Sequence, residues 1–193
     1  MLTLALPVVV TDPNKGATSG LMPVAVLQEG ARITNIFAPD VTYNPIDGVG
    51  TVFRMLRYFS ADSSLLIDAG SSTEGYNQYL VQFNQERIGP KRFLFYEAQF
   101  KYDTDLSARF YGLGNDSEDR SESSYVFRRT LSGASLGIRL PLNMAAQFRE
   151  QIVSYKVGPG RLEDVPSSRL VHKDVFGVDS TDPGGYFPRE FRL

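Results

Sequence analysis

The sequence of 193 residues contains no cysteine, no tryptophan and a single histidine. Without cysteine the chain cannot form disulfide bonds, supply a thiolate nucleophile or hold zinc through sulfur ligands. The lone histidine, His172, excludes a metal site built from several histidines of this chain. The lack of tryptophan removes a residue that is common at membrane interfaces, although tyrosine serves there as well.

An excess of charge of one sign is also missing. The chain has 20 Lys and Arg against 22 Asp and Glu, which gives a net charge of −2. Nucleic-acid binding requires a basic surface that displaces the counterions of phosphate, so no nucleic acid is expected as a partner. No apolar run reaches the ~18 residues of a transmembrane helix.

The apolar N-terminal stretch, Met1–Val10, lacks the basic start and the small-residue cleavage site of a signal peptide. We therefore expect a strand there. Export across a membrane requires a signal peptide, so if the protein is exported, we expect this sequence to be a mature or trimmed chain or a fragment.

The sequence is rich in aromatic residues and turn formers, with 13 Phe, 10 Tyr, 17 Gly and 11 Pro. This composition predicts an all-β, antiparallel fold in one domain. A mean hydropathy of −0.20 fits a soluble protein and also a membrane barrel, in which only alternate strand residues meet lipid. We expect roughly eight to ten strands over residues 1–157 and a loop-like tail over residues 158–193.

Alternation of apolar and polar residues is clearest around residue 98. The apolar set is Leu94, Tyr96, Ala98, Phe100 and Tyr102, and the polar set between them is Glu97, Gln99 and Lys101. This pattern predicts a strand with the first set toward lipid and the second toward a polar lumen. It also fits a strand of a soluble sandwich that has one solvated face, and periodicity alone does not separate the two.

The segment from Tyr125 to Leu140 changes phase, because its early apolar residues have odd numbers and its later ones even numbers. We expect a bulge or a tight bend at Ser132-Gly133, which would turn the later residues to the other face.

Two aromatic residues and two glycines form a short motif in the middle of the chain, comprising Phe110, Tyr111, Gly112, Gly114 and Asn115. The motif and its neighbours, over roughly residues 5–180, resemble the barrel domain of the BamA/TamA family, the bacterial surface-antigen superfamily. The resemblance implies a transmembrane β-barrel in the outer membrane of Gram-negative bacteria, with a role in outer-membrane protein assembly or transport. Within the motif we expect structural roles, with the aromatics at an interface and the glycines allowing the backbone to bend.

The resemblance covers only the first half of such a barrel. Family barrels have sixteen strands and a later Arg-Gly-Phe/Tyr lid-loop motif, and this sequence does not contain that motif. Besides outer-membrane lipid, a second polypeptide is therefore an expected partner, because it would complete the barrel. The alternatives are a small self-contained barrel with a structural, adhesive or pore role, and a soluble β-sandwich or lipocalin-like binding protein.

Other residue clusters give weaker signals. Six arginines could line an anion-selective lumen or pair with acids on its wall, namely Arg54, Arg57, Arg128, Arg129, Arg139 and Arg149. The acidic residues Asp116, Glu118, Asp119 and Glu122 lack the spacing of an EF-hand, so a solvated loop is expected. His172 lies near Asp174, but no Gly-x-Ser-x-Gly elbow is present. We expect no catalytic residue, no metal site and no cofactor, and hence no enzyme.

Overall fold

The computed structural model describes residues 1–111, 122–141, 144–168, 185–186 and 190–192. Within them the chain forms one antiparallel sheet, so the prediction of an antiparallel all-β fold is confirmed. The strands are β1 (Leu2–Asp12), β2 (Gly16–Glu29), β3 (Arg32–Phe37), β4 (Asp40–Asn44), β5 (Gly48–Ser60), β6 (Ser63–Ser72), β7 (Asn77–Ile88), β8 (Leu94–Phe110), β9 (Ser123–Arg139), β10 (Ala145–Pro159), β11 (Gly185–Tyr186) and β12 (Glu190–Arg192).

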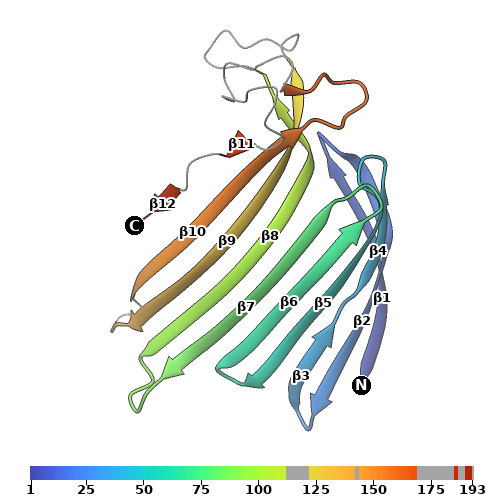
Figure 1. The fold of residues 1–193 in the computed structure, drawn as a ribbon. Helices are drawn as coiled ribbons and strands as arrows, with labels where there is room; N and C mark the ends of the chain where they lie inside the picture. Colours follow the sequence, from blue (N-terminus) through green and yellow to red (C-terminus); the bar gives the residue numbers. More distant parts are fainter. Residues whose placement is uncertain (112–121, 142–143, 169–184, 187–189, 193) are drawn as a thin grey trace.

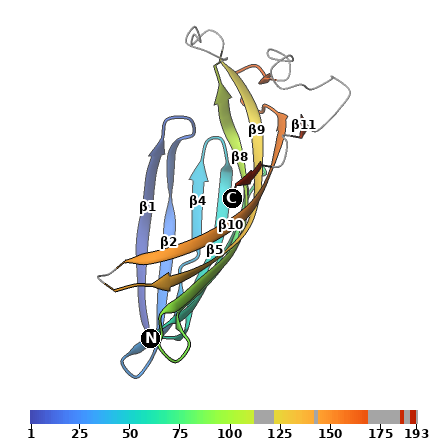
Figure 2. The same cartoon turned by 90° about the vertical axis from the view of Figure 1, so that its left-hand side faces the viewer.

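Neighbouring strands in the sheet are mostly neighbours in sequence. The order is β1-β2-β3-β5-β6-β7-β8-β9-β10-β11, with β4 pairing β2 and β5, and β12 pairing β10. Figures 1 and 2 show that the sheet is twisted and curved into an open trough. Among the described residues β1 and β10 do not pair with each other, so this sheet is open rather than a closed ring.

Two hairpin turns at the same end of the sheet are closed by the same type of hydrogen bond, from a backbone N–H to a side-chain oxygen. In the first turn, the carboxylate of Asp12 accepts hydrogen bonds from the backbone N–H groups of Asn14 at 2.7 Å and Lys15 at 3.0 Å. In the second, the Asn44 side chain accepts a hydrogen bond from the backbone N–H of Ile46 at 2.9 Å. Such side-chain bonds replace a missing backbone partner and close the turn, which is why Asp and Asn precede many turns.

The third crossing of the sheet is broken into β3 and β4. Pro39 lies at the break and has no N–H to give to a neighbouring strand. The backbone N–H of Ala38 still reaches the Arg54 carbonyl at 2.9 Å, so the two halves continue along β5. Beside β4, a Cβ at Gly20 would lie 2.3 Å from the Val41 carbonyl oxygen, so β2 approaches β4 closely only because this residue is glycine.

The bulge expected at Ser132-Gly133 is absent, and that prediction is wrong. β9 pairs β10 in one unbroken register through these residues. The irregularity lies in β8 instead, between Asp105 and Ala108. In the upper part of β9, Phe127 lies on the same face as Arg129, whereas Leu136 lies on the opposite face lower down. The apolar residues of β9 therefore change faces without a bulge in the strand.

Buried apolar side chains are few and lie at one end of the sheet. Among the described residues they are Leu106, Val126 and Val157. They lie where the β8–β9 hairpin extends beyond its neighbours and meets the segment 160–168. Ser124 donates its N–H to the Pro166 carbonyl at 2.8 Å there. In the described residues no second layer of protein covers either face of the sheet.

The described residues of the predicted tail, 158–193, include the end of β10 and two short strands. β10 continues to Pro159, two residues past the expected boundary at residue 157. The short strands β11 and β12 then pair along β10, with Val157 opposite Gly185 and Ile152 opposite Phe191. In the described part of the chain no helix has the length and hydropathy needed to cross a membrane.

Candidate functional site

The two faces of the sheet have different chemistry, and strand register identifies the residues of each. Phe53 lies opposite Ala69, Ala69 opposite Tyr79, and Tyr79 opposite Tyr102, so these residues share what we call the apolar face. Its further large members are Val41, Tyr43, Met55, Ile67, Val81, Phe83, Tyr96, Phe100, Leu136, Ile138, Phe148 and Ile152.

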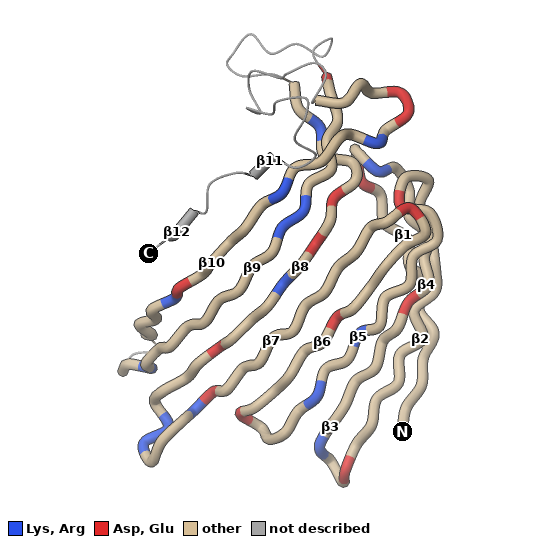
Figure 3. The backbone as a smooth tube through the Cα atoms, viewed as in Figure 1, with Lys and Arg blue, Asp and Glu red and all other residues tan. Residues whose placement is uncertain are grey.

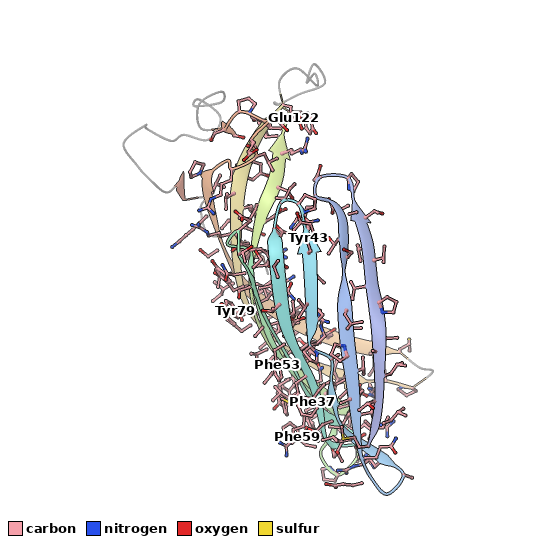
Figure 4. All side chains as sticks on the ribbon, turned by 90° about the vertical axis from the view of Figure 1, so that its right-hand side faces the viewer. Phe37, Tyr43, Phe53, Phe59, Tyr79 and Glu122 are labelled. Carbon is pink, nitrogen blue, oxygen red and sulfur yellow. The ribbon has the colours of Figure 1, made fainter. Side chains whose placement is uncertain are left out.

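No described part of the chain covers the apolar face. Phe100 is 44% exposed, Ile152 51% and Phe148 63%. Aromatic rings contact one another along the face, with Phe83 and Tyr96 at a centroid distance of 5.5 Å and Tyr79 and Tyr102 at 5.9 Å. Figure 4 labels some of its aromatic residues, which run from Phe59 near the lower end of the sheet toward its upper end.

The strand β8 places the residues expected to face lipid on this apolar face. Leu94, Tyr96, Ala98, Phe100 and Tyr102 pair with apolar-face residues of β7 and β9, as in the pairing of Ala98 with Ala134. Glu97, Gln99 and Lys101, which the sequence assigns to a lumen, lie on the opposite face, which we call the polar face. The structure therefore confirms that these two sets of residues lie on opposite faces, and contact of the first set with lipid remains a prediction.

The polar face is the inner face of the trough, because side chains from strands that are not adjacent meet on it. The Arg54 guanidinium on β5 lies 3.1 Å from the carboxylate of Asp40 and 3.2 Å from that of Asp68. It also lies 3.6 Å from the Met22 sulfur on β2. Gln78 donates to the other oxygen of Asp68 at 2.7 Å. This network joins five strands, from β2 to β7, around one arginine.

A second set of ion pairs follows β8. Arg129 on β9 donates to both oxygens of Asp103, at 3.0 and 3.3 Å. Lys101 is 3.7 Å from the same carboxylate, and Arg149 on β10 is 3.8 Å from Glu97. Figure 3 shows acidic and basic positions interspersed across the middle strands. The charges of the polar face therefore largely neutralise one another across neighbouring strands.

At the upper end of the trough, Lys15 connects the first hairpin to distant strands. Its ammonium lies 3.1 Å from Asp47 in the β4–β5 turn and 3.8 Å from Asp105 on β8. It also lies over the Tyr76 ring, 4.8 Å from the centroid. Burial, together with the surrounding carboxylates of which Asp47 acts most strongly, raises the pKa of the Tyr76 phenol to about 12. This phenol stays protonated at neutral pH and donates to Gln78.

Four of the six arginines lie among the ion pairs of the sheet. Arg54, Arg129 and Arg149 face the trough, and Arg139 pairs with Glu86 at 2.8 Å at its lower end. Arg57 and Arg128 lie on the apolar face, so they do not line the inside of the trough. Arg57 instead lies over the Phe59 ring at 5.0 Å. The arrangement favours pairing with acids over an anion-selective surface.

The aromatic motif lies at the top of the β8–β9 hairpin. Phe110 ends β8 opposite Ser123, and the Tyr111 hydroxyl donates to Glu122 at 3.2 Å. Arg109 binds the same Glu122 oxygen, which accounts for one of the acidic residues considered as a cation ligand. The other candidates in this region lie outside the described residues, namely Gly112, Gly114, Asn115, Asp116, Glu118, Asp119 and His172.

Two features were missed at the level of sequence. The Lys15 cluster joins segments up to ninety residues apart in the chain, and no local pattern marks it. Glu150 lies on the apolar face, where it interrupts the series Ala146, Phe148 and Ile152. The alternation of β10 contains that signal, because an acid stands at a position where the period predicts an apolar residue.

Chemically, the arrangement separates an apolar surface from a polar one. Among the described residues no group of three or more His, Cys, Asp or Glu side chains is placed to hold a metal ion. Comparisons with protein-family models, with curated proteins and with solved structures found no match.

Proposed function

We propose that this chain forms part of the wall of a transmembrane β-barrel in the bacterial outer membrane. The apolar face contacts lipid and the polar face lines an aqueous interior. The barrel resembles those of the BamA/TamA family, and its role is in outer-membrane protein assembly or transport. The resemblance of the motif at Phe110 to that family supports this role, whereas the two faces of the sheet support the membrane location.

The observation that carries the membrane proposal is the uncovered apolar face. The accessible surface is 12572 Å², against about 9,200 Å² expected for a soluble globular monomer of this mass. Large apolar side chains on β7 to β10 contribute to the excess. Apolar patches of this extent on soluble monomers are rare. A soluble β-sandwich or a lipocalin-like protein would bury these residues against a second layer of protein. The uncovered face therefore argues against both of these alternatives.

The polar face supports the same proposal. In a membrane barrel the inner residues of each strand are polar and alternate with outer apolar ones. Arg54 binds acids on both adjacent strands and Arg129 binds Asp103 on β8, which holds strand against strand and leaves none of these charges unpaired. Such pairs are compatible with a water-filled interior, where charged groups keep part of their hydration.

The two outer strands require a partner in this setting. In lipid an unpaired backbone N–H or C=O costs several kcal/mol, so an open edge is not stable. β1 has no neighbour on its outer side among the described residues, and β11 and β12 cover only part of β10. A second polypeptide or further strands therefore complete the wall. This favours a part of a larger barrel over a small self-contained one.

The experiment that tests the proposal is a gel-mobility assay on native protein extracted in detergent, run with and without heating. The intact mass of each band is measured. We expect a compact unheated band that contains this chain together with additional strands from a second polypeptide or a longer product. A compact band with the mass of this chain alone would establish a small closed barrel instead. Full solubility without detergent would refute the membrane location.

A further inference from the structure

Glu150 is an acidic residue in the middle of the apolar face on β10. Along its own strand the neighbours on that face are Phe148 and Ile152, and across the sheet it lies opposite Ala134. The side chain is exposed. Among the described residues its carboxylate forms no hydrogen bond and no ion pair. The polar-face charges next to it behave differently, since Arg149 pairs with Glu97.

A shallow groove leads from Glu150 across three strands. Its volume is about 670 Å³. Small residues form the floor: Ala134 and Ala98 lie in the row that leads from Glu150 to Phe83, and Ser132 lies in the adjacent row between Ile152 and Phe100. The groove therefore offers a recess in which another apolar segment can lie close to the backbone, with one carboxylate at its end.

Lipid alone does not suit this recess, if the apolar face meets the membrane as proposed above. An acyl chain fills the apolar part but leaves a carboxylate in hydrocarbon, which is costly. The ammonium of a lipid headgroup stays at the membrane surface. The next polar residue of this face along β10 is Ser154, four residues or about 13 Å from Glu150. A charge at this depth is usually paired with another protein charge.

We propose that the groove is a docking surface for an apolar segment of a second polypeptide that places a lysine or arginine against Glu150. Charge complementarity selects the basic residue, and the small floor residues select a segment that packs closely. Most of the groove lies over β7, β8 and β9, away from the outer edge of the sheet, and Glu150 at its end lies on the edge strand β10. The inference rests on the proposed membrane location.

The test is photocrosslinking in membranes of the cells that make the protein. The full chain carries a benzoylphenylalanine at position 148, where it replaces the exposed Phe148 beside Glu150 on the same face and leaves the small residues of the groove unchanged. We expect one polypeptide adduct, with the crosslinked peptide containing a basic residue. Glu150→Gln reduces the adduct at least about tenfold, as expected when a desolvated charge pair is lost. Glu150→Asp retains part of it, and Gln151→Glu on the opposite face of the strand has no effect.

Reversing both charges provides the decisive result. Glu150→Lys abolishes the adduct, and changing the basic residue of the partner to glutamate restores it. Adducts to lipid only, or an adduct that is unchanged by Glu150→Gln, would overturn the inference. The heat-modifiable compact band is recorded for every variant. Loss of that band in the unmodified protein would refute the membrane location itself, whereas its presence without a charge-dependent adduct would refute only the docking surface.

Discussion

Replacing Phe100 by arginine tests the assignment of the apolar face to lipid. Phe100 lies in the centre of β8 between Ala98 and Tyr102, with Val81 and Ser132 opposite it on the neighbouring strands. It is 44% exposed, so almost half of the ring meets whatever surrounds the protein. Gln99 is the matched control, because it is the adjacent residue of the same strand and faces the trough.

The expected magnitude follows from the location. Arginine on the lipid face of a barrel costs about 2–4 kcal/mol near the middle of the bilayer, and less near its surfaces. Taking about 3 kcal/mol, Phe100→Arg shifts the folding equilibrium in a membrane by roughly 100-fold. Gln99→Arg adds a cation beside Glu97 and Lys101 on a face where water screens charges, so we expect a change below about 1 kcal/mol.

The assay is folding of the complete barrel into phospholipid vesicles across a urea series, with the compact gel band as the measure of folded protein. Phe100→Leu is included to separate the loss of the ring from the gain of a charge. We expect Phe100→Arg to move the midpoint strongly, and Phe100→Leu and Gln99→Arg to move it little. Equal tolerance of arginine at both positions would refute the assignment of the apolar face to lipid.

Three further predictions concern the sheet itself. Arg54→Leu leaves the carboxylates of Asp40 and Asp68 without their cation, and we expect a loss of about 2–4 kcal/mol in unfolding free energy by urea titration; no loss would mean that the pairs are fully solvated. Because the pKa of Tyr76 is about 12 in the folded protein against a usual 10, its contribution to stability is complete below pH 10 and is lost as pH rises from 10 to 12. Tyr76→Phe should remove this component of the alkaline unfolding curve, and an unchanged curve would contradict it. Gly20→Ala forces a Cβ against the Val41 carbonyl and should lower the unfolding free energy by about 1–3 kcal/mol, measured by thermal unfolding. Gly50→Ala is the control, because its Cβ would meet the Thr42 hydroxyl at 3.3 Å, and it should lower the unfolding free energy less.

Local periodicity was sufficient to predict the antiparallel strands and, in β8, the two faces. Alternation from Leu94 to Tyr102 is a property of the strand itself, and the pairing with β7 and β9 preserves it. The failure at Ser132-Gly133 has a specific cause. A change of phase in the apolar pattern indicates a bulge only when one face is apolar throughout, and here the upper polar face carries an aromatic cluster in which Phe127 and Tyr155 stack at 5.2 Å.

Contacts between distant strands were beyond the reach of the sequence. Nothing near Lys15 indicates that it meets Asp105, because curvature of the whole sheet brings the first hairpin toward β8. The same limit applies to the arginines, since residue type does not tell on which face Arg57 or Arg54 lies until the register is known. Glu150 was detectable as a break in alternation, but its meaning depends on the groove beside it.

The division of the third crossing into β3 and β4 has a mechanical consequence. Eight residue pairs join β2 to β3 and β4, and eight join β3 and β4 to β5, whereas fifteen join β8 to β9. The first hairpin is therefore attached to the rest of the sheet through fewer residue pairs than join β8 and β9, at a point where Pro39 has no N–H to donate. Amide hydrogens near residues 34–42 should exchange with solvent sooner than those of β8 and β9. We expect the sheet to bend most readily along this line, and we expect the contacts of Lys15 with Asp47 and Asp105 at the upper end to limit that bending.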